Sequence, residues 1–317
     1  MKRGLLILCT AFIALSAPES ALAANVSYVR TVWNHTSANV VQVNMDSPNI
    51  RVTPALAKHG AGSSEGFKSM VNRLHPIAAI TGTFFCTRSL QPTGDIVIEG
   101  KPMHRGCVGT GLCIMDDGRV EFKSLKDGRA SGWQGCRTVI CGGPTLVRHG
   151  RVTLAPRSEG FRDPGFFRQK RRSAVGLTKS NKLLMVTVDK PIYLSDLAKL
   201  LIHLGAVDAV DLDGGSSTAL YYRGKIVSRP ERRLTNLLVV YESPSQYAAY
   251  RSELAPKMPQ IAIAAEPAAV LGDGILSDLF GKAPKLTPAD ALRRYSHPLP
   301  DPQNGLQVIS SKPSSLD

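Results

Sequence analysis

The sequence predicts an α+β fold in which a mixed, hairpin-rich β-sheet core is covered by a few helices. Three observations support this prediction. Short apolar segments separated by Asp-Gly or other glycine turns are the commonest pattern. Only two segments show the spacing of an amphipathic helix. Strands do not alternate regularly with helices, as they would in a parallel βαβ fold. We therefore expect a single folded domain followed by a disordered C-terminal tail.

The chain divides into three predicted parts. Residues 1–23 resemble a signal peptide, because Lys2 and Arg3 precede a short apolar run and Ala21-Leu22-Ala23 forms a cleavage site. The apolar run is too short for a membrane span, so no transmembrane anchor should remain after cleavage. Residues 24–243 are long enough to bury a sizeable core. Residues 244–317 are rich in Pro and Ala and predict a mostly disordered tail, with room for short helices near 246–254 and 288–295.

The first half of the domain should alternate strands with one helix. We expect strands at residues 40–45, 49–53 and 77–81. Between them, Phe67, Met70, Val71 and Leu74 recur at helical spacing and predict a helix over residues 63–75, which Pro76 stops.

The second half should consist mainly of hairpins. Their predicted strands are residues 95–98, 112–115, 119–122, 145–147, 173–178, 183–188, 207–212, 221–222 and 237–241. A second helix should begin with Ser195 as its N-cap and end at Gly205. Its leucines recur on one face, so it should cover a sheet.

Five cysteines remain after the predicted cleavage: Cys86, Cys107, Cys113, Cys136 and Cys141. An exported protein meets an oxidising compartment, where disulfides persist. An odd number allows at most two internal bridges, and close spacing favours Cys107–Cys113 and Cys136–Cys141, although spacing leaves other pairings open. No Cys-x-x-Cys motif or histidine cluster indicates a zinc site, and we predict no metal and no cofactor.

The formal net charge of +14 and the pI of 9.7 indicate a basic surface. Because the mature protein should be periplasmic or secreted, nucleic acid is not an expected partner. A basic surface there would concentrate anionic glycans, phosphoglycans or lipid head groups. The alternative is a solvated basic surface without functional weight.

The densest polar stretch follows the predicted strand at residues 207–212. Side chains alternate along a strand, so Asp211 and Asp213 should point the same way. Gly214 and Gly215 then turn the chain, and Ser216, Ser217 and Thr218 follow. A plain turn would need one Asp-Gly only. The stretch therefore predicts a polar pocket with two carboxylates.

Three further stretches place glycines or polar residues at strand ends. They are Thr81-Gly82-Thr83-Phe84-Phe85, Gly142-Gly143-Pro144-Thr145-Leu146 and Arg172-Ser173-Ala174-Val175-Gly176. With the Asp211–Thr218 stretch, and in this order, they resemble the phosphodiester glycosidase domain family over residues 40 to 242. Asn236-Leu237-Leu238 matches the family's closing Asn-x-Leu strand. Three positions depart from the family pattern: Thr81 stands for Asn, Ser173 for Thr, and Asp211 where Asn is common.

The resemblance implies hydrolysis of a sugar-1-phosphodiester at the anomeric carbon, in an envelope or extracellular glycan. A departing phosphate needs positive charge and N–H donors. Arg172 could grip its oxygens bidentately, and the N–H groups from Gly214 to Ser217 could form an anion nest. Asp213 is the expected catalytic carboxylate and Asp211 its partner. The matched motifs also give the expected substrate-contacting positions Thr81, Gly82, Phe85, Gly143, Gly214, Gly215, Ser216, Ser217 and Asn236.

Other functions compete with this interpretation. The domain could bind an anionic wall glycan without cleaving it. His104-Arg105-Gly106-Cys107 weakly resembles the motif of Cys-dependent L,D-transpeptidases, although Arg105 interrupts it. The Asp211 stretch also resembles the first motif of haloacid-dehalogenase-type phosphatases, but Gly215 stands where Thr or Val is required. A calcium loop starting at Asp211 would place Tyr222, rather than Glu, at its last ligand position.

Overall fold

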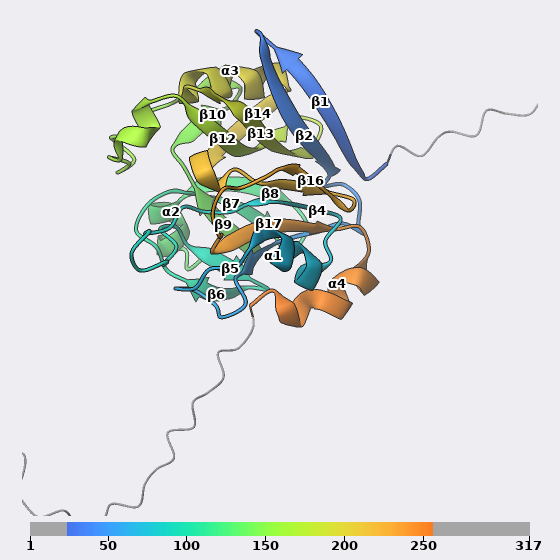
Figure 1. Ribbon diagram of the computed structural model, residues 1–317. Coiled ribbons are helices and arrows are strands. Elements are labelled where there is room, and N and C mark those ends of the chain that lie inside the picture. The colour runs from blue at the N-terminus through green and yellow to red at the C-terminus, as the bar shows by residue number, and fades with distance from the viewer. Residues whose placement is uncertain (1–23, 256–317) are drawn as a thin grey trace, which may run out of the picture. The chain divides into compact units, whose positions relative to one another are not determined.

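The computed structural model describes residues 24–255, which form three β-sheets and a few short helices (Figure 1). The predicted signal peptide lies outside the described residues, as does the tail from residue 256 onward. The α+β class and the hairpin-rich core with few helices are confirmed. The described strand pairs are antiparallel rather than mixed, because neighbouring strands are joined by tight turns or return across the domain.

The first sheet has seven strands in the order β1-β2-β13-β12-β14-β10-β11. Its strands are β1 (Val26–Trp33), β2 (Thr36–Asn44), β10 (Thr145–Arg148), β11 (Arg151–Val152), β12 (Lys170–Thr178), β13 (Lys182–Ile192) and β14 (Ala206–Leu212). The hairpin of β12 and β13 and strand β14 lie at its centre. The end of β14, with its two carboxylates, is therefore held by a strand on each side.

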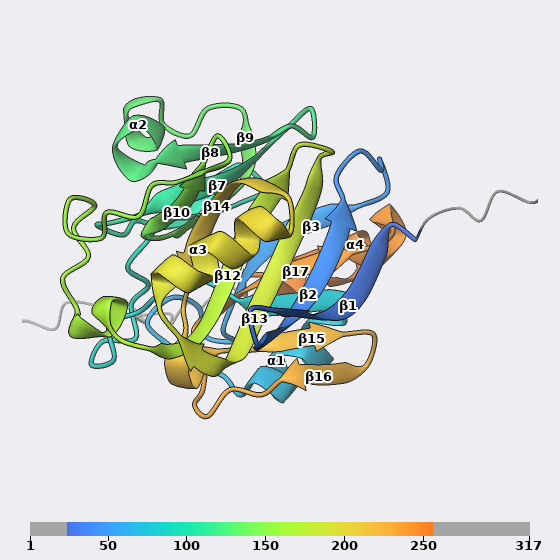
Figure 2. The same cartoon turned by 90° about the horizontal axis from the view of Figure 1, so that it is seen from above.

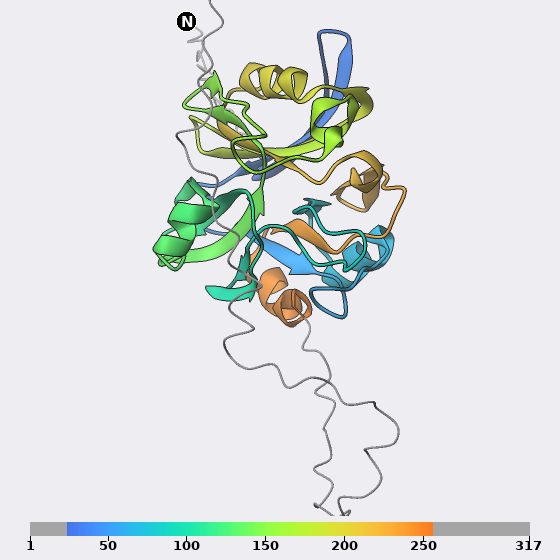
Figure 3. The same cartoon turned by 90° about the vertical axis from the view of Figure 1, so that its left-hand side faces the viewer.

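The other two sheets have five strands each. One has the order β16-β15-β4-β17-β3, built from β3 (Arg51–Leu56), β4 (Ala78–Thr81), β15 (Leu220–Tyr222), β16 (Lys225–Ser228) and β17 (Asn236–Tyr241). The other has the order β6-β5-β9-β7-β8, built from β5 (Ile96–Ile98), β6 (Lys101–His104), β7 (Thr110–Met115), β8 (Val120–Ser124) and β9 (Cys136–Gly142). Figure 3 shows the first sheet above these two.

The main core lies where the three sheets face one another. It joins Val175 and Leu212 of the first sheet to Ile80 and Leu238 of the second and to Ile140 of the third. Helix α3 (Leu194–His203) covers the opposite face of the first sheet, as Figure 2 shows. Helix α1 (Phe67–Leu74) covers the second sheet, and the short α2 (Leu125–Ala130) lies beside β7 and β8.

Both predicted helices exist, with adjusted ends. The four periodic residues of α1 are buried, but the helix begins at Phe67 and ends before His75, whose φ of 45° is left-handed. Helix α3 begins at Leu194 with Tyr193 as its cap, so the prediction of Ser195 as N-cap is wrong. Burial of Leu194 against the sheet starts the helix two residues earlier. Gly205, at φ 88°, ends it as predicted.

The folded region extends beyond residue 243. Helix α4 (Pro244–Tyr250) and the turn Arg251–Glu253 follow directly, and Leu254 is fully buried. The Leu254 carbonyl accepts a 2.7 Å hydrogen bond from the Leu56 N–H. The predicted boundary at 243 is therefore too early. The boundary was predicted from the Pro- and Ala-rich composition that begins there. Composition does not reveal this short segment's stability, which comes from packing rather than from its own apolar periodicity.

The cysteines of residues 24–255 are all free thiols, so neither favoured disulfide is present. Cys107 is exposed on a loop, whereas Cys113 is buried inside β7. Cys113, Cys136 and Cys141 belong to one apolar cluster with Trp133. Burial raises the pKa of Cys113 and of Cys141, so both thiols stay neutral at pH 7.

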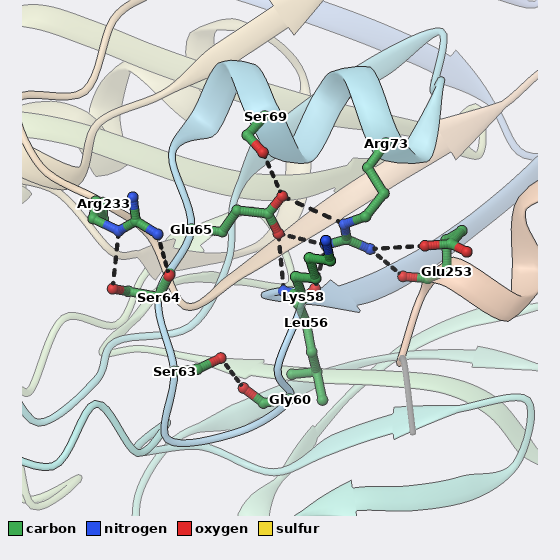
Figure 4. A network of polar contacts seen from close by, with 10 residues as sticks. All are labelled: Leu56, Lys58, Gly60, Ser63, Ser64, Glu65, Ser69, Arg73, Arg233 and Glu253. Carbon is green, nitrogen blue, oxygen red and sulfur yellow. Dashed lines mark hydrogen bonds and ion pairs between the residues drawn. The ribbon is translucent and has the colours of Figure 1, made fainter. Parts of the chain in front are cut away.

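A buried ionic network ties α1 to β3 and to the C-terminal segment (Figure 4). Glu65 accepts a 2.7 Å bond from Arg73 Nη2, a 2.7 Å bond from Ser69 and a 2.9 Å bond from the Lys58 N–H. Arg73 also donates to the carbonyls of Leu56 and Glu253. Within residues 24–255, no helix is long and apolar enough to cross a membrane.

Candidate active site

A pocket of about 440 Å³ lies where the end of β14 meets the segment that follows β4. The Asp213 N–H donates to the Gly82 carbonyl at 3.0 Å and joins these two segments. The pocket wall comes from five parts of the chain: residues 84–93, 107–108, 160–172 and 213–216, and Arg232. Of the predicted site residues, Phe85, Arg172, Asp213, Gly214, Gly215 and Ser216 line it.

Asp213 provides a carboxylate at the base of the pocket. The residue is only 5% exposed, and Oδ2 lies 3.1 Å from Arg232 Nη2. Burial raises the pKa of Asp213, while a hydrogen bond from Ser217, the charge of Arg232 and the Gly214 N–H act in the opposite direction. A carboxylate with a raised pKa beside a pocket is suited to proton transfer.

Asp211 lies behind Asp213 and does not line the pocket. Its Oδ2 is 3.8 Å from Arg172 Nη1, and its buried Oδ1 has no hydrogen-bond partner. Burial raises the pKa of Asp211 well above the usual value, despite the nearby charge of Arg172. Asp211 is therefore a buried acid that favours its protonated form. Asp211 and Asp213 are brought together as predicted, but in different environments.

Arg172 reaches the pocket from β12 with most of its donors already engaged. Its Nε donates to the Ile192 carbonyl at 3.3 Å, and Nη2 donates to the carbonyls of Gly165 and Arg168 at 3.2 and 2.6 Å. These bonds fix the guanidinium so that Nη1 faces Asp211. Burial lowers the pKa of Arg172. Arg172 thus presents a fixed positive charge rather than a guanidinium that is free to bind phosphate oxygens bidentately.

Sequence reasoning missed three cationic residues that line the pocket, Arg162, Lys170 and Arg232. Arg232 lies over the Phe85 ring at 4.4 Å from its centroid and donates to Ser217 Oγ at 2.6 Å. It is therefore held on three sides, by Phe85, Ser217 and Asp213. The sequence did offer a signal for Arg232, because this residue lies only four residues before the matched Asn236 motif. Its inward direction depends on the loop and could not be inferred from spacing.

The predicted anion nest of the Gly214–Ser217 turn is partly engaged within the protein, because the Ser217 N–H donates to the Gly214 carbonyl at 3.1 Å and the Gly214 N–H bonds to Asp213. Gly215–Ser217 forms a single 3₁₀ turn, and Gly215 has a left-handed φ of 61°. A Cβ on Gly214 would lie 2.8 Å from the Arg171 carbonyl, so only glycine fits against β12 there. Ser217 is fully buried and supports Arg232 and Asp213 instead of facing the pocket. Ser216 lies at the pocket wall.

The remaining predicted residues support the pocket from behind. Asn236 is buried, accepts a 2.7 Å bond from the Thr83 N–H and donates to the Thr83 carbonyl. A Cβ on Gly82 would lie 1.9 Å from Asn236 Oδ1, which explains the glycine. The Gly143 N–H donates to the Asp211 carbonyl at 2.7 Å, and Thr81 is buried in β4. The predicted positions Thr81, Gly82, Gly143 and Asn236 do not line the pocket.

Aromatic rings form part of the pocket wall. Phe161 and Phe166 meet edge to face at 5.0 Å, and Phe84 lies 5.3 Å from Phe166. These rings belong to the 84–93 and 160–172 segments, so they also join the two walls. Aromatic rings in the wall of a pocket that also holds a carboxylate are suited to the apolar face of a sugar ring.

The alternative Cys–His arrangement lacks a free histidine. His104 Nε2 lies 2.6 Å from the Pro92 carbonyl and is occupied by that contact. Cys107 is exposed at the pocket wall, with its N–H bonded to the Thr93 carbonyl. This geometry gives the transpeptidase interpretation no support.

Comparisons with known proteins agree with the motifs. Residues 75–241, more than half of the chain, match the family model described as phosphodiester glycosidase (NAGPA). A hypothetical protein from Synechocystis is similar in structure, with a TM-score of 0.60 and 16% identity, over 68% of this chain and 61% of that protein. The zebrafish N-acetylglucosamine-1-phosphodiester alpha-N-acetylglucosaminidase catalytic domain, auto-inhibited by its pro-peptide, gives a TM-score of 0.57 and 21% identity, over 68% of this chain and 82% of that domain. At these identities the structural likeness establishes the shared fold. No curated protein matches the chain.

Proposed function

The chain belongs to the phosphodiester glycosidase family, and on this premise we propose that it hydrolyses the bond between a sugar's anomeric carbon and a phosphodiester oxygen. The observation that carries the proposal is the placement of Asp213. A buried carboxylate at the base of a pocket is flanked by Lys170, Arg172 and Arg232 and by the backbone at Gly214. A carboxylate serves the anomeric carbon, and cations serve the phosphate.

The reaction follows from this arrangement. Water adds to the anomeric carbon while the bond from that carbon to the phosphate oxygen breaks. The electron pair of that bond leaves with the phosphate, giving a phosphate monoester and a free reducing sugar. Such a leaving group needs charge stabilisation more than protonation, which Lys170, Arg172 and Arg232 supply. Asp213 stabilises the developing positive charge on the sugar or accepts the proton of water.

Asp211 has a supporting role in this proposal. It lies outside the pocket wall and favours its protonated form, since burial raises its pKa. A neutral Asp211 leaves the positive charge of Arg172, 3.8 Å away, available to the phosphate. Two neighbouring carboxylates with unlike environments can in this way take unlike roles.

We also propose that the protein is exported and acts on a cell-envelope or extracellular glycan. The support is the Ala21-Leu22-Ala23 site after a short apolar run, together with the basic composition. N-terminal sequencing of the protein recovered outside the cytoplasm should begin at Ala24. Recovery of a chain that still starts at Met1 would contradict export.

Turnover separates the enzyme from a binding module. Purified protein is incubated with a panel of sugar-1-phosphodiesters, and free reducing sugar and phosphate monoester are measured together. We expect the two products in equal amounts from at least one substrate, with Asp213→Asn as the inactive control. Binding of these compounds without release of either product would favour the non-catalytic glycan-binding alternative.

A further inference from the structure

The segment that forms one wall of the pocket carries positive charge both at the pocket and outside it. Arg157, Arg162 and Arg168 are exposed on the segment between β11 and β12, and Lys170 is exposed at the start of β12. Arg88 is exposed on the segment after Phe85. Of these, Arg162 and Lys170 line the pocket and the other three do not. We call these five residues the cationic rim. Phe84 and Phe161, whose ring centroids lie 6.1 Å apart, bring the two segments together. The loop is the yellow-green segment that projects beside β12 in Figure 2.

The rim charges are not neutralised by protein carboxylates. Within residues 24–255, none of the five belongs to an ion pair. The loop's two acids have local partners: Glu159 accepts from the Thr145 N–H and hydroxyl, and Asp163 accepts from the Gly165 N–H. Like charges collected without counter-charges destabilise a compact fold. Their concentration around one pocket therefore indicates an anionic ligand that extends outside it.

Part of the rim is also held in place. The Arg157 guanidinium lies over the Phe167 ring at 4.9 Å from its centroid, although Phe167 is 40% exposed. Arg157 and Phe167 do not line the pocket, and neither does Arg168. An exposed phenylalanine paired with an arginine offers a flat apolar face and a charge side by side. This combination suits a sugar ring followed by a phosphate.

We propose that Arg157, Phe167 and Arg168 form an outer subsite for a poly(glycosyl phosphate) chain, so that the natural substrate is a polymer of repeating phosphodiesters. This proposal rests on the proposed function, since the pocket cleaves the terminal unit. Arg162, Lys170, Arg172 and Arg232 line the pocket and would serve the phosphate at the cleaved bond. The outer residues would contact the following units and raise the encounter rate with a polyanion.

The test compares two substrates of one sugar, the methyl phosphodiester of the sugar 1-phosphate and a poly(glycosyl 1-phosphate) of at least ten units. The test variant is Arg157→Gln/Arg168→Gln. The matched control is Lys179→Gln/Lys182→Gln, which removes two exposed charges at the opposite end of the β12–β13 hairpin. That end is about 26 Å away, at about 3.3 Å per strand residue. Circular dichroism confirms that both variants are folded.

We expect the wild type to prefer the polymer in kcat/KM by about 10-fold or more at low salt, and to lose this preference as salt is added. Arg157→Gln/Arg168→Gln should lower kcat/KM for the polymer by about 3–10-fold and leave the methyl phosphodiester unchanged. The lysine control should change neither. Equal effects of both variants, or a polymer preference insensitive to both, would overturn the subsite.

Failure of the proposed function has a different signature. If neither substrate is turned over, polymer binding is measured directly by calorimetry with the same variants. Weaker binding by Arg157→Gln/Arg168→Gln alone would retain the subsite while rejecting the glycosidase. Equal affinity of the two variants for the polymer would reject the subsite. Binding to anionic lipid vesicles but not to the polymer would also reject it.

Discussion

Two buried carboxylates of this domain face an arginine, yet their environments differ. Glu65, on the α1 side, accepts hydrogen bonds from Arg73, Ser69 and the Lys58 N–H (Figure 4). Burial alone would raise the pKa of Glu65, but the bonds from Arg73 and Ser69 bring it below its usual value. Asp211, beside the pocket, has one oxygen 3.8 Å from Arg172 and another without a partner, and burial raises its pKa.

The difference separates a structural carboxylate from one kept for chemistry. Native proteins satisfy nearly all buried polar atoms, so an unsatisfied one requires a reason. Glu65 is satisfied, and together with Arg73 it joins α1, β3 and the C-terminal segment. Asp211 and Asp213 keep raised pKa values beside a pocket, where proton transfer and charge stabilisation need them. The predictions below test this contrast.

The largest effect on the free energy of unfolding should come from breaking the Glu65–Arg73 ion pair. Glu65→Gln keeps the shape but leaves the buried Arg73 with only the exposed Glu253 carboxylate, 3.9 Å away, as a counter-charge. The change should cost about 3 kcal/mol of unfolding free energy at pH 7. The folded pKa of Glu65 is lowered, so its stabilisation is present at neutral pH and is lost as the pH falls through that pKa. The difference between wild type and variant, measured in urea, should shrink in acid. A constant difference would exclude ionisation as its source.

Asp213→Asn should affect activity instead of stability. If the carboxylate takes part in the reaction, kcat should fall at least ~10²-fold while the melting temperature changes little. Because burial raises the pKa of Asp213 above its ordinary 3.8, the acid limb of the wild-type kcat/KM profile should lie above that value. A folded variant that turns over at near wild-type rate would transfer the catalytic role to Asp211.

Arg172→Lys should have an intermediate effect. A lysine keeps the charge but cannot bond three carbonyls and face Asp211 at once. We expect kcat/KM for sugar-1-phosphodiesters to fall by about 10-fold, with a smaller change for an aryl glycoside of the same sugar. Equal losses for both substrates would mean that Arg172 supports the pocket without serving the phosphate.

Asp211→Asn should have the smallest effect on stability. If Asp211 is already protonated in the native state, the change should cost less than about 1 kcal/mol at pH 7. Its folded pKa is raised, so wild-type stability contributed by this group is present below pH 3.8 and is lost as the pH rises through the folded pKa. The variant should therefore lose less stability between acid and neutral pH. A loss of about 3 kcal/mol or more would show an ionised Asp211 paired with Arg172.

The sequence was sufficient where local pattern determines structure. Phe67, Met70, Val71 and Leu74 predicted α1, and the Asp211–Gly215 stretch predicted the carboxylates and the turn. Strand β1 was missed because an edge strand is only partly buried and lacks strict alternation. Arg232 was missed because its direction is set by Phe85 and Ser217, which are distant in sequence. Asn236 was expected at the substrate but lies behind the Gly82–Thr83 turn.

The position of β4 in its sheet has a consequence for synthesis and folding. Strand β4 lies between β15 and β17, and Asn236 holds Thr83 across 153 residues of sequence. The segment that begins with Gly82 therefore reaches its place only after β17 has been made and has paired. Pairings this distant in sequence form slowly, in the range of about milliseconds to seconds. A growing chain that ends before β17 would hold Asp213 without its pocket, so the protein would remain inactive until nearly the whole domain is complete.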